Sequence, residues 1–571
     1  MMTELNDNAL SEQSPYIGYI VGGTLKANLN VRLTVPPHTV QLGSFVVVES
    51  DSWMFYGLIT DLQLGSTDPR FADEQSEVRL PPELARLLHG QTLYTNLEMM
   101  PALMLNCGPG LDSPDYDDWR DANPDETHPR PVRTVPAHHA LVRLASAGDV
   151  AEIFGSPDDE EFFVIGTTKE QDHPICINLK KFVQRSSGIF GATGTGKSFL
   201  TRIILAGLIK YDQSSVLVFD MHNEYGFDDS ASDSNQKVTG LKSKFTNVRV
   251  VGLGAGSQIR GNSPDFNLVL AEKDIQPEDI GLLAGELNLT ETTSATLEAL
   301  VTDFGRTKWF HEFKNMKTNR VVENEEGELV PAPGTVEAWA AKRNVHMQAA
   351  KALHNKLGRV FNKPYILEEA PSDSFGEVIK GLESGLHYVI SFGKHEEDLD
   401  YLLVSNLLTR KIRSRWEQLT NDARGHDKST PRPLVIVIEE AHKLLNREMA
   451  SQTIFSTIAR EMRKYYVTLL VVDQRPSQIY DEVMSQLGTR ISGWLGDDAD
   501  IQAVLSGLAA KDSLRGMLAT LEQTKEVLLL GWGVPMPLPV RSIRYDTAFW
   551  EYLLGNSSKR PVEDILDELG F

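Results

Sequence analysis

The stretch GIFGATGTGKS, residues 188–198, decides the fold, because residues 191–198 fit the P-loop pattern GxxxxGK[ST] at every fixed position. The apolar residues 188–190 read as the end of a buried strand. The segment after the loop reads as an amphipathic helix, whose apolar stripe consists of Leu200, Ile203, Ile204 and Leu208. A phosphate-binding loop requires this order of strand, loop and helix. The sequence therefore predicts an α/β nucleotide-binding domain.

The loop contains the residue types that hold phosphate groups. Glycines let the backbone curl so that successive N–H groups face the β- and γ-phosphates, and the helix N-terminus adds partial positive charge. Lys197 supplies a point charge, and the Ser198 hydroxyl is a ligand for Mg²⁺. With ATP and Mg²⁺ as cofactors, the expected ATP-binding residues are Gly191, Ala192, Thr193, Gly194, Thr195, Gly196, Lys197, Ser198 and Phe199. The alternative is a glycine-rich turn that matches the pattern by chance, and the strand before it and the helix after it argue against this.

A second chemical element ends the apolar run of residues 434–438. Two acids, Glu439 and Glu440, follow this run, which has the form of a Walker B strand. We expect Glu439 to hold the Mg²⁺ with its water shell and Glu440 to polarise the attacking water. The alternative is a solvated pair of acids at a strand end, and the P-loop upstream argues against it.

A third apolar run, residues 467–472, is followed by the string DQRP. A polar residue at the tip of the neighbouring strand is where such a site holds a γ-phosphate sensor, so Gln474 is the candidate. The alternative is a plain strand-to-turn connector that ends at Pro476.

The helix expected over residues 452–464 carries Arg460 and Arg463 on the face opposite its apolar stripe. A guanidinium that reaches the γ-phosphate of a neighbouring subunit would neutralise charge in the transition state, as an arginine finger does. Most arginines on helices are simply solvated. The choice between the two arginines, and between this role and a surface position, stays open.

The rest of the chain divides by pattern. Short strands and turns predict an N-terminal β-barrel with a long acidic loop, and an amphipathic helical stretch interrupts the later alternation of strands and helices. The expected regions are a barrel at 14–145, the first part of the core at 150–273, a helical insertion at 274–383, the second part of the core at 384–545, and a tail at 546–571.

Composition limits the class of protein. The 571 residues are 41% hydrophobic and 24% charged, which is ordinary for a globular protein that buries a sizeable core. The chain has two cysteines, too few for a disulfide framework or a structural zinc site. No apolar run approaches the roughly 20 residues that span a bilayer. We therefore expect a cytoplasmic protein with no membrane partner.

The formal net charge of −23 argues against a nucleic-acid partner, because phosphates repel an acidic surface. A ring that threads DNA needs cations only around its channel, so the objection is not decisive. Two groups of cations are candidates, and solvated faces are the alternative for both. We prefer the first as DNA-binding: Lys237, Lys242 and Lys244, ahead of Arg410, Lys411, Arg413 and Arg415.

Together these motifs resemble the HerA family of hexameric DNA translocases, relatives of the FtsK motors. The matching strings are GIFGATGTGKS, VFDMHNEYG, VIVIEEAHKLL, IAREMRKYYVTLLVVDQRPSQI and MSQLGTRI. The resemblance implies a RecA-like core, a HAS-type barrel, a helical bundle and a tail that packs on the neighbouring subunit. It also implies a homohexamer that moves on double-stranded DNA as an ATP-driven helicase.

Two departures from the family pattern concern the backbone. Residues 220–225 read DMHNEY where the family reads close to DPHGEY, and the glycines expected near Met462 and Tyr466 are absent. The first leaves the P-loop and the paired acids untouched. The second bears on the path of the helix around Arg463.

The resemblance implies a partner protein as well. Members work beside a nuclease of the NurA type in DNA-end processing, or beside a nuclease or an NAD-consuming effector of the sirtuin type in antiphage defence. We slightly favour defence, because the chain lacks the Lys/Glu-rich composition of hyperthermophile proteins. Two other functions stay open: an ATP-gated ring scaffold that activates a defence effector, and a motor for protein substrates, against which the missing membrane segment counts.

Overall fold

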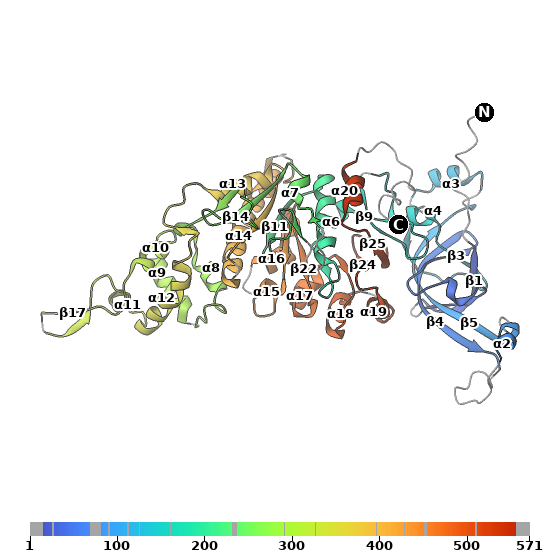
Figure 1. The fold of residues 1–571 in the computed structure, drawn as a ribbon, viewed down its shortest axis with the longest axis horizontal. Coiled ribbons are helices and arrows are strands. Elements are labelled where there is room, and N and C mark those ends of the chain that lie inside the picture. Colours follow the sequence, from blue (N-terminus) through green and yellow to red (C-terminus); the bar gives the residue numbers. More distant parts are fainter. Residues whose placement is uncertain are drawn as a thin grey trace.

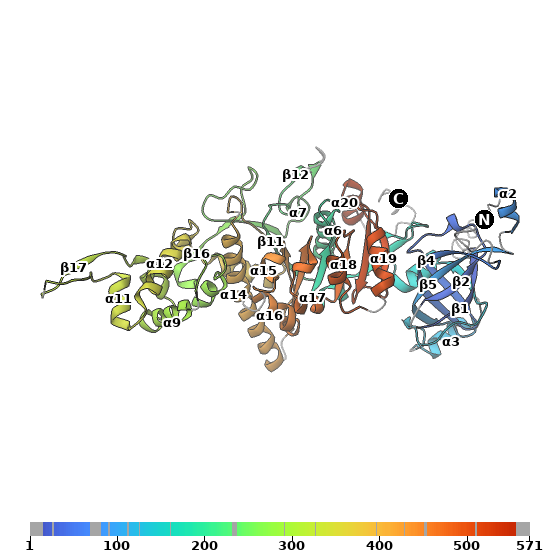
Figure 2. The same cartoon turned by 90° about the horizontal axis from the view of Figure 1, so that it is seen from below.

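In the computed structural model, three bodies follow one another along an elongated molecule: a β-barrel at one end, an α/β core in the middle and a helical insertion at the other end (Figures 1 and 2). The structure describes residues 15–25, 28–68, 81–88, 92–110, 113–124, 126–159, 161–230, 237–290, 292–325, 327–395, 397–426, 429–449, 454–508 and 511–555.

The N-terminal barrel is antiparallel throughout, and pairing of β2 with β5 closes it. Its strands are β1 (Tyr16–Gly23), β2 (Leu29–Leu33), β3 (Phe45–Ser50), β4 (Trp53–Ser66), β5 (Leu93–Asn106) and β7 (Leu141–Leu144), with the short β6 (Arg130–Pro131) beside β5. Successive side chains of β2 point to opposite faces of the strand, so Leu29, Val31 and Leu33 are buried inside the barrel. The expected β-barrel is confirmed.

The core is one twelve-stranded sheet in the order β15-β14-β20-β11-β21-β22-β10-β23-β24-β25-β8-β9. Its parallel strands are β10 (Ser187–Phe190), β11 (Ser215–Asp220), β14 (Val248–Leu253), β15 (Phe266–Leu268), β20 (His387–Ser391), β21 (Leu434–Glu439), β22 (Val467–Asp473) and β23 (Thr489–Ser492). The antiparallel strands are β24 (Glu526–Gly531), β25 (Leu538–Ser542), β8 (Phe162–Thr167) and β9 (Pro174–Asn178).

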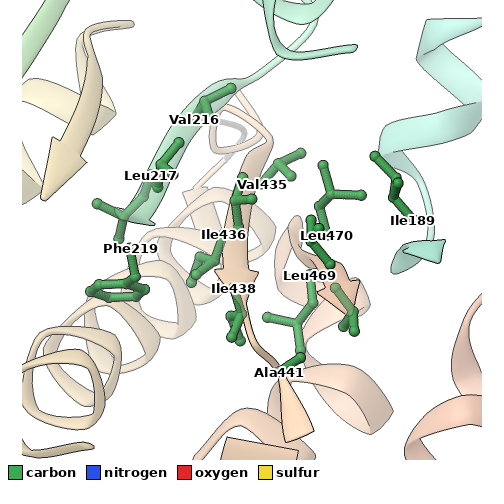
Figure 3. Packing of buried hydrophobic residues seen from close by; sticks show 14 of the residues in the cluster. Ile189, Val216, Leu217, Phe219, Val435, Ile436, Ile438, Ala441, Leu469 and Leu470 are labelled. Atoms are coloured by element: carbon green, nitrogen blue, oxygen red, sulfur yellow. The ribbon is translucent and has the colours of Figure 1, made fainter. Parts of the chain in front are cut away.

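The central parallel strands are buried on both faces, which is why they read as continuous apolar runs. Side chains of β21, such as Ile436 and Ile438, lie between those of β11 and β22 (Figure 3). Each such side chain contributes roughly 1.5–3 kcal/mol by leaving water. This packing holds the strand ends in register, so that Phe190 pairs with Asp473 and Glu439 with Val472.

Helices cover the sheet and carry the loops to its edges. The helix α6 (Lys197–Lys210) packs on β8, β10 and β11, and α13 (Ser374–Glu383) packs on β11 and β20. The long α14 (Asp398–His426) contacts α16 (Ile454–Glu461). The expected α/β core is confirmed.

The helical insertion branches from the core between two short strands that pair with each other, β16 (Leu270–Ala271) and β19 (Ile366–Leu367). It contains α8 (Pro277–Leu282), α9 (Thr292–Phe304), α10 (Trp309–Asn315), α11 (Val336–Arg343) and α12 (Met347–Phe361), with the hairpin of β17 (Val321–Glu323) and β18 (Leu329–Pro331). Trp309, Phe310 and Phe361 pack edge to face in its centre. Residues 374–383, which we expected in this insertion, form α13 on the core sheet instead.

The C-terminal helix α20 (Thr547–Leu554) packs on α6 of its own chain, with Phe549 and Trp550 buried. The remainder of the expected tail, residues 556–571, lies outside the described residues. Contact of the tail with a neighbouring subunit stays a prediction. Among the helices that the structure describes, none has the length and apolar character needed to cross a membrane.

Candidate nucleotide site

The P-loop runs from the carboxyl end of β10 to the start of α6, as the sequence predicts. The N–H of Ala192 donates to the carbonyl of Trp494 at 2.9 Å, and the N–H of Gly493 donates to the carbonyl of Phe190 at 2.8 Å. These bonds attach the loop to the segment that follows β23. Gly196 precedes the helix with φ of 86°, a left-handed conformation that glycine adopts without strain.

Lys197 lies inside this loop with its ammonium turned back on the loop itself. Its Nζ donates to the carbonyl of Ala192 at 2.9 Å. Burial lowers the pKa of Lys197, while the carboxylates of Glu440 and Asp473 act in the opposite direction. Because an ammonium has three donors, a bound phosphate can take up the positions that this carbonyl does not fill.

Glu439 is the last residue of β21, and its carboxyl group is buried. Its Oε1 accepts a hydrogen bond from the Tyr225 hydroxyl at 2.5 Å, while its Oε2 is buried without a hydrogen-bond partner in the described part of the chain. Burial, followed by the nearby Asp220 and Glu224, raises the pKa of Glu439 well above its ordinary value. An unpaired carboxylate oxygen among other acids is suited to a cation, so these residues fit Mg²⁺.

Glu440 lies where β21 turns away from the sheet, with φ of 45°. A left-handed backbone is unfavourable for a glutamate and costs about 1–3 kcal/mol, so its surroundings must hold it. The amide of Gln474 reaches Glu440 Oε2 at 3.4 Å, and Gln474 Oε1 accepts from the Thr193 hydroxyl at 2.6 Å. The structure thus brings together the expected sensor, the expected base and a P-loop hydroxyl.

Sequence reasoning missed three residues around the paired acids, of which Tyr225 and His442 contact them and Asp473 contacts His442. Tyr225 supports Glu439, while His442 and Asp473 lie beside Glu440, with His442 Nδ1 3.6 Å from Glu440 Oε2 and 3.0 Å from Asp473 Oδ2. All three lie in strings that carry the family resemblance, VFDMHNEYG, EEAH and VVDQRPS. Their position within these matching strings was the signal by which the sequence could have indicated them.

Phe199, the last of the expected ATP-binding residues, is 38% exposed at the start of α6. Its ring lies 6.0 Å from that of Tyr545, and the Arg202 guanidinium lies 5.4 Å from its centre. The side chain therefore stands open to solvent directly after the phosphate-binding loop.

The two candidate finger arginines lie away from this site. The expected helix 452–464 is wrong at its C-terminal end: α16 ends at Glu461, and residues 462–465 form a 3₁₀ turn. The turn ends at Tyr466 with φ of 64°, a conformation suited to the glycine that this chain lacks. Residues 450–453 lie outside the described part.

Arg463 precedes β22, whereas the P-loop follows the opposite end of the adjacent β10. The seven residues of β22 separate the two by roughly 20 Å. Arg460 is 3.5 Å from Glu482, and both side chains are about half exposed, so this ion pair is weak. Neither arginine reaches the P-loop of its own chain.

The lysines expected to contact DNA lie on β13 (Lys237–Val238) and α7 (Leu241–Lys244), where their partners come from the same chain. Lys237 and Lys242 pair with Asp228 and Asp265, and the ammonium of Lys244 lies 5.5 Å over the Trp550 ring. The second group is also paired, with the acids Asp279, Asp274, Glu417 and Glu383 facing Arg410, Lys411, Arg413 and Arg415. Three of these pairs attach α14 to neighbouring elements, and the pair of Arg413 with Glu417 lies within α14.

Comparison with known proteins agrees with the motifs. Residues 163–412 match the family described as the central domain of helicase HerA. The DNA double-strand break repair helicase HerA of Sulfolobus acidocaldarius is 25% identical over 544 residues, which cover 93% of each chain. The protein of the same name from Sulfurisphaera tokodaii is 25% identical over 540 residues, again 93% of each chain.

Among solved structures, the bacterial conjugative coupling protein TrwB aligns with 70% of this chain and 92% of its own, at a TM-score of 0.44 and 11% identity. The sequence matches confirm the resemblance to HerA and the expectation of a P-loop ATPase.

The arrangement predicts different defects for the two central residues. Lys197→Ala removes the charge that faces the phosphates, so ATP binding and hydrolysis should both fall, hydrolysis by about 100-fold or more. Glu440→Gln keeps the shape of the site and loses the carboxylate, so this variant should bind ATP and fail to hydrolyse it. Equilibrium binding of labelled ATP and steady-state phosphate release measure the two effects. Normal turnover by Lys197→Ala would contradict the assignment of the P-loop.

Proposed function

We propose that this chain, which shares the central domain of the HerA helicases and is similar to them over nearly its whole length, is an ATP-driven translocase of double-stranded DNA. One observation supports it above the others. The P-loop, Glu439 and Glu440, and Gln474 lie at adjacent strand tips on one edge of the sheet. This arrangement supports our proposal that these residues act as phosphate-binding loop, cation-binding acid, base and sensor around one nucleotide.

In this proposal each residue has one task. The backbone N–H groups of residues 191–196 and Lys197 bind the phosphates, while Ser198 and Glu439 would hold Mg²⁺, which neutralises charge on the β- and γ-phosphates when bound. Glu440 orients and deprotonates the attacking water, and Gln474 contacts the γ-phosphate. Phe199 offers an open aromatic ring beside the site, suited to the base of the nucleotide.

An arginine finger would add a second positive charge to that of Lys197 at the γ-phosphate. The candidate Arg463 lies at the opposite, amino edge of the sheet, where it precedes β22. A head-to-tail assembly in which the amino edge of one subunit meets the carboxyl edge of the next would deliver this charge, and such contacts close into a ring when the rotation per subunit divides the circle. We propose a homohexamer, the number that the HerA resemblance implies.

A further arginine on the amino edge escaped sequence reasoning. Arg185 precedes β10, and its guanidinium lies 4.1 Å from the centre of the Trp532 ring. Its Nε is buried without a hydrogen-bond partner among the described residues, and Trp532 is 44% exposed. A cation stacked on an exposed indole is suited to an interface with a neighbouring subunit. Arg185 therefore joins Arg463 and Arg460 as a candidate finger.

The DNA and the partner protein belong to the same proposal. The relatives are named as helicases of double-strand break repair, and a chain of net charge −23 can accept DNA only along a local basic surface. Of the three expected lysines, Lys244 has no carboxylate partner in the described part of the chain and is the best placed. The partner we propose is a nuclease of the NurA type or a defence effector.

Double-stranded DNA should stimulate the ATPase rate at low salt, and the stimulation should decline as salt rises, because phosphate contacts release counterions. Steady-state hydrolysis with and without duplex DNA over a salt series measures this, with Lys197→Ala as the background. A rate that ignores DNA at low salt would contradict translocation and favour the ATP-gated scaffold.

A shared site predicts that two inactive variants rescue each other. Arg463→Ala, Arg460→Ala or Arg185→Ala should bind ATP and assemble normally but lose hydrolysis if that arginine is the finger. Mixing it with Glu440→Gln should restore about a quarter of wild-type activity at equal ratio, since about one junction in four pairs an intact acid with an intact arginine.

Native mass spectrometry shows whether the rings are mixed, and ATPase assays on the same samples give the rescue. A fully active monomer, or no rescue by any of the three arginine variants in mixed rings, would exclude the shared site for these residues.

A further inference from the structure

The turn after β21, residues 440–442, is attached to the tip of the neighbouring strand β22 by its backbone. The N–H of Ala441 donates to the carbonyl of Val472 at 3.4 Å, and the N–H of His442 donates to Asp473 Oδ2 at 2.7 Å. Both bonds follow Glu440 directly. Together with the bond from the N–H of Lys443 to the carbonyl of Glu440 at 2.9 Å, they support the left-handed backbone of Glu440, which is unfavourable without such support.

Asp473 is the centre of this attachment. It is 1% exposed, and its Oδ2 also faces the His442 imidazole, with Nδ1 at 3.0 Å. Its other oxygen, Oδ1, accepts from the N–H of Arg475 at 2.7 Å. A buried carboxylate with these partners is well satisfied, and it connects the turn, the imidazole and the segment that carries Gln474.

The imidazole of His442 lies between two carboxylates. Its Nδ1 is 3.0 Å from Asp473 Oδ2 and 3.6 Å from Glu440 Oε2, and the Gln474 amide approaches that same Glu440 oxygen. The hydrogen bond to Asp473 raises the pKa of His442, burial opposes this, Glu440 adds to the rise and Lys443 reduces it. The ring therefore lies between Asp473 and the Glu440 carboxylate that would orient the attacking water.

We infer that Asp473 and His442 are positioning residues for ATP hydrolysis, which hold the Glu440 carboxylate beside Gln474 through the turn and the imidazole. The inference rests on the proposed role of Glu440 as the base. Among the hydrogen bonds of the described residues, the Asp473 side chain accepts from His442 and Arg475, so the pair acts on the turn that carries Glu440. A base that is misplaced by about 1 Å loses about 100-fold in rate, which sets the scale of the effect.

A positioning role and a merely structural one predict different patterns. Loss of positioning lowers kcat and leaves the affinity for ATP unchanged, because the phosphate-binding loop is attached to β23 and not to this turn. Loss of structure weakens binding and assembly together with turnover. Replacement of His442 by a side chain that keeps only the hydrogen bond to Asp473 distinguishes the two roles further, because it restores that contact without the ring.

The test compares His442→Ala, His442→Asn and the control Lys443→Ala in the full chain. The asparagine amide can take the place of Nδ1 and donate to Asp473. The Lys443 ammonium pairs with Asp398 and not with Asp473, so this neighbour of His442 serves as the matched control. Steady-state assays give kcat and KM for ATP, and a fluorescent non-hydrolysable ATP analogue gives the affinity.

We expect His442→Ala to lower kcat by about 10- to 100-fold with KM and analogue affinity unchanged. His442→Asn should recover much of the loss, and Lys443→Ala should remain near wild type. Asp473→Asn, which preserves volume, should lower kcat in the same way. In the Glu440→Gln background, His442→Ala should cause no further loss of the residual rate, because its effect passes through the missing carboxylate.

Wild-type kcat in His442→Ala, beside an inactive Glu440→Gln, would overturn the inference and leave the proposed function intact. Equal losses of analogue affinity and kcat, without recovery in His442→Asn, would assign the pair a structural role and also overturn it. An active Glu440→Gln would remove the base itself. That failure of the proposed function is recognisable because it does not involve His442.

Discussion

The parallel pairing of β10, β22 and β21 is the constraint on which the site depends. These three strands are adjacent and in register, so the residues that follow Phe190, Asp473 and Glu439 meet at one edge of the sheet. The apolar side chains between the sheet and its helices hold that register (Figure 3). A slip of one residue would turn Glu439 to the other face and separate the acids from the P-loop.

Charge is the second constraint, because this edge concentrates acids in a buried place. Burial, Asp220 and Glu224 raise the pKa of Glu439, and one of its carboxylate oxygens has no hydrogen-bond partner in the described part of the chain. The opposite edge carries Arg463 and Arg185. A head-to-tail neighbour would bring these cations to the acidic edge, which is why the site and the assembly are argued together.

The local parts of this site could be predicted from the sequence, since a P-loop and a Walker B strand are short patterns with their own chemistry. The side-chain contacts that join these two motifs to the rest of the site could not be predicted. Tyr225 meets Glu439 across 214 residues and Thr193 meets Gln474 across 281, and only the strand order brings them together. The helix around Arg463 was misjudged because periodicity does not reveal that Tyr466 takes a left-handed backbone. The boundary of the insertion was misjudged because the amphipathic pattern of α13 predicts a helix but does not indicate whether that helix packs on the insertion or on the core sheet.

The most direct test of this account is a structure of the full chain with Mg²⁺ and a non-hydrolysable ATP analogue. The account predicts the γ-phosphate between Lys197 and Gln474, the metal between Ser198 and Glu439, and a water within hydrogen-bond distance of Glu440. It also predicts an arginine of the neighbouring subunit at the same phosphate. A γ-phosphate remote from Glu440, or a site closed by the residues of one chain alone, would contradict it.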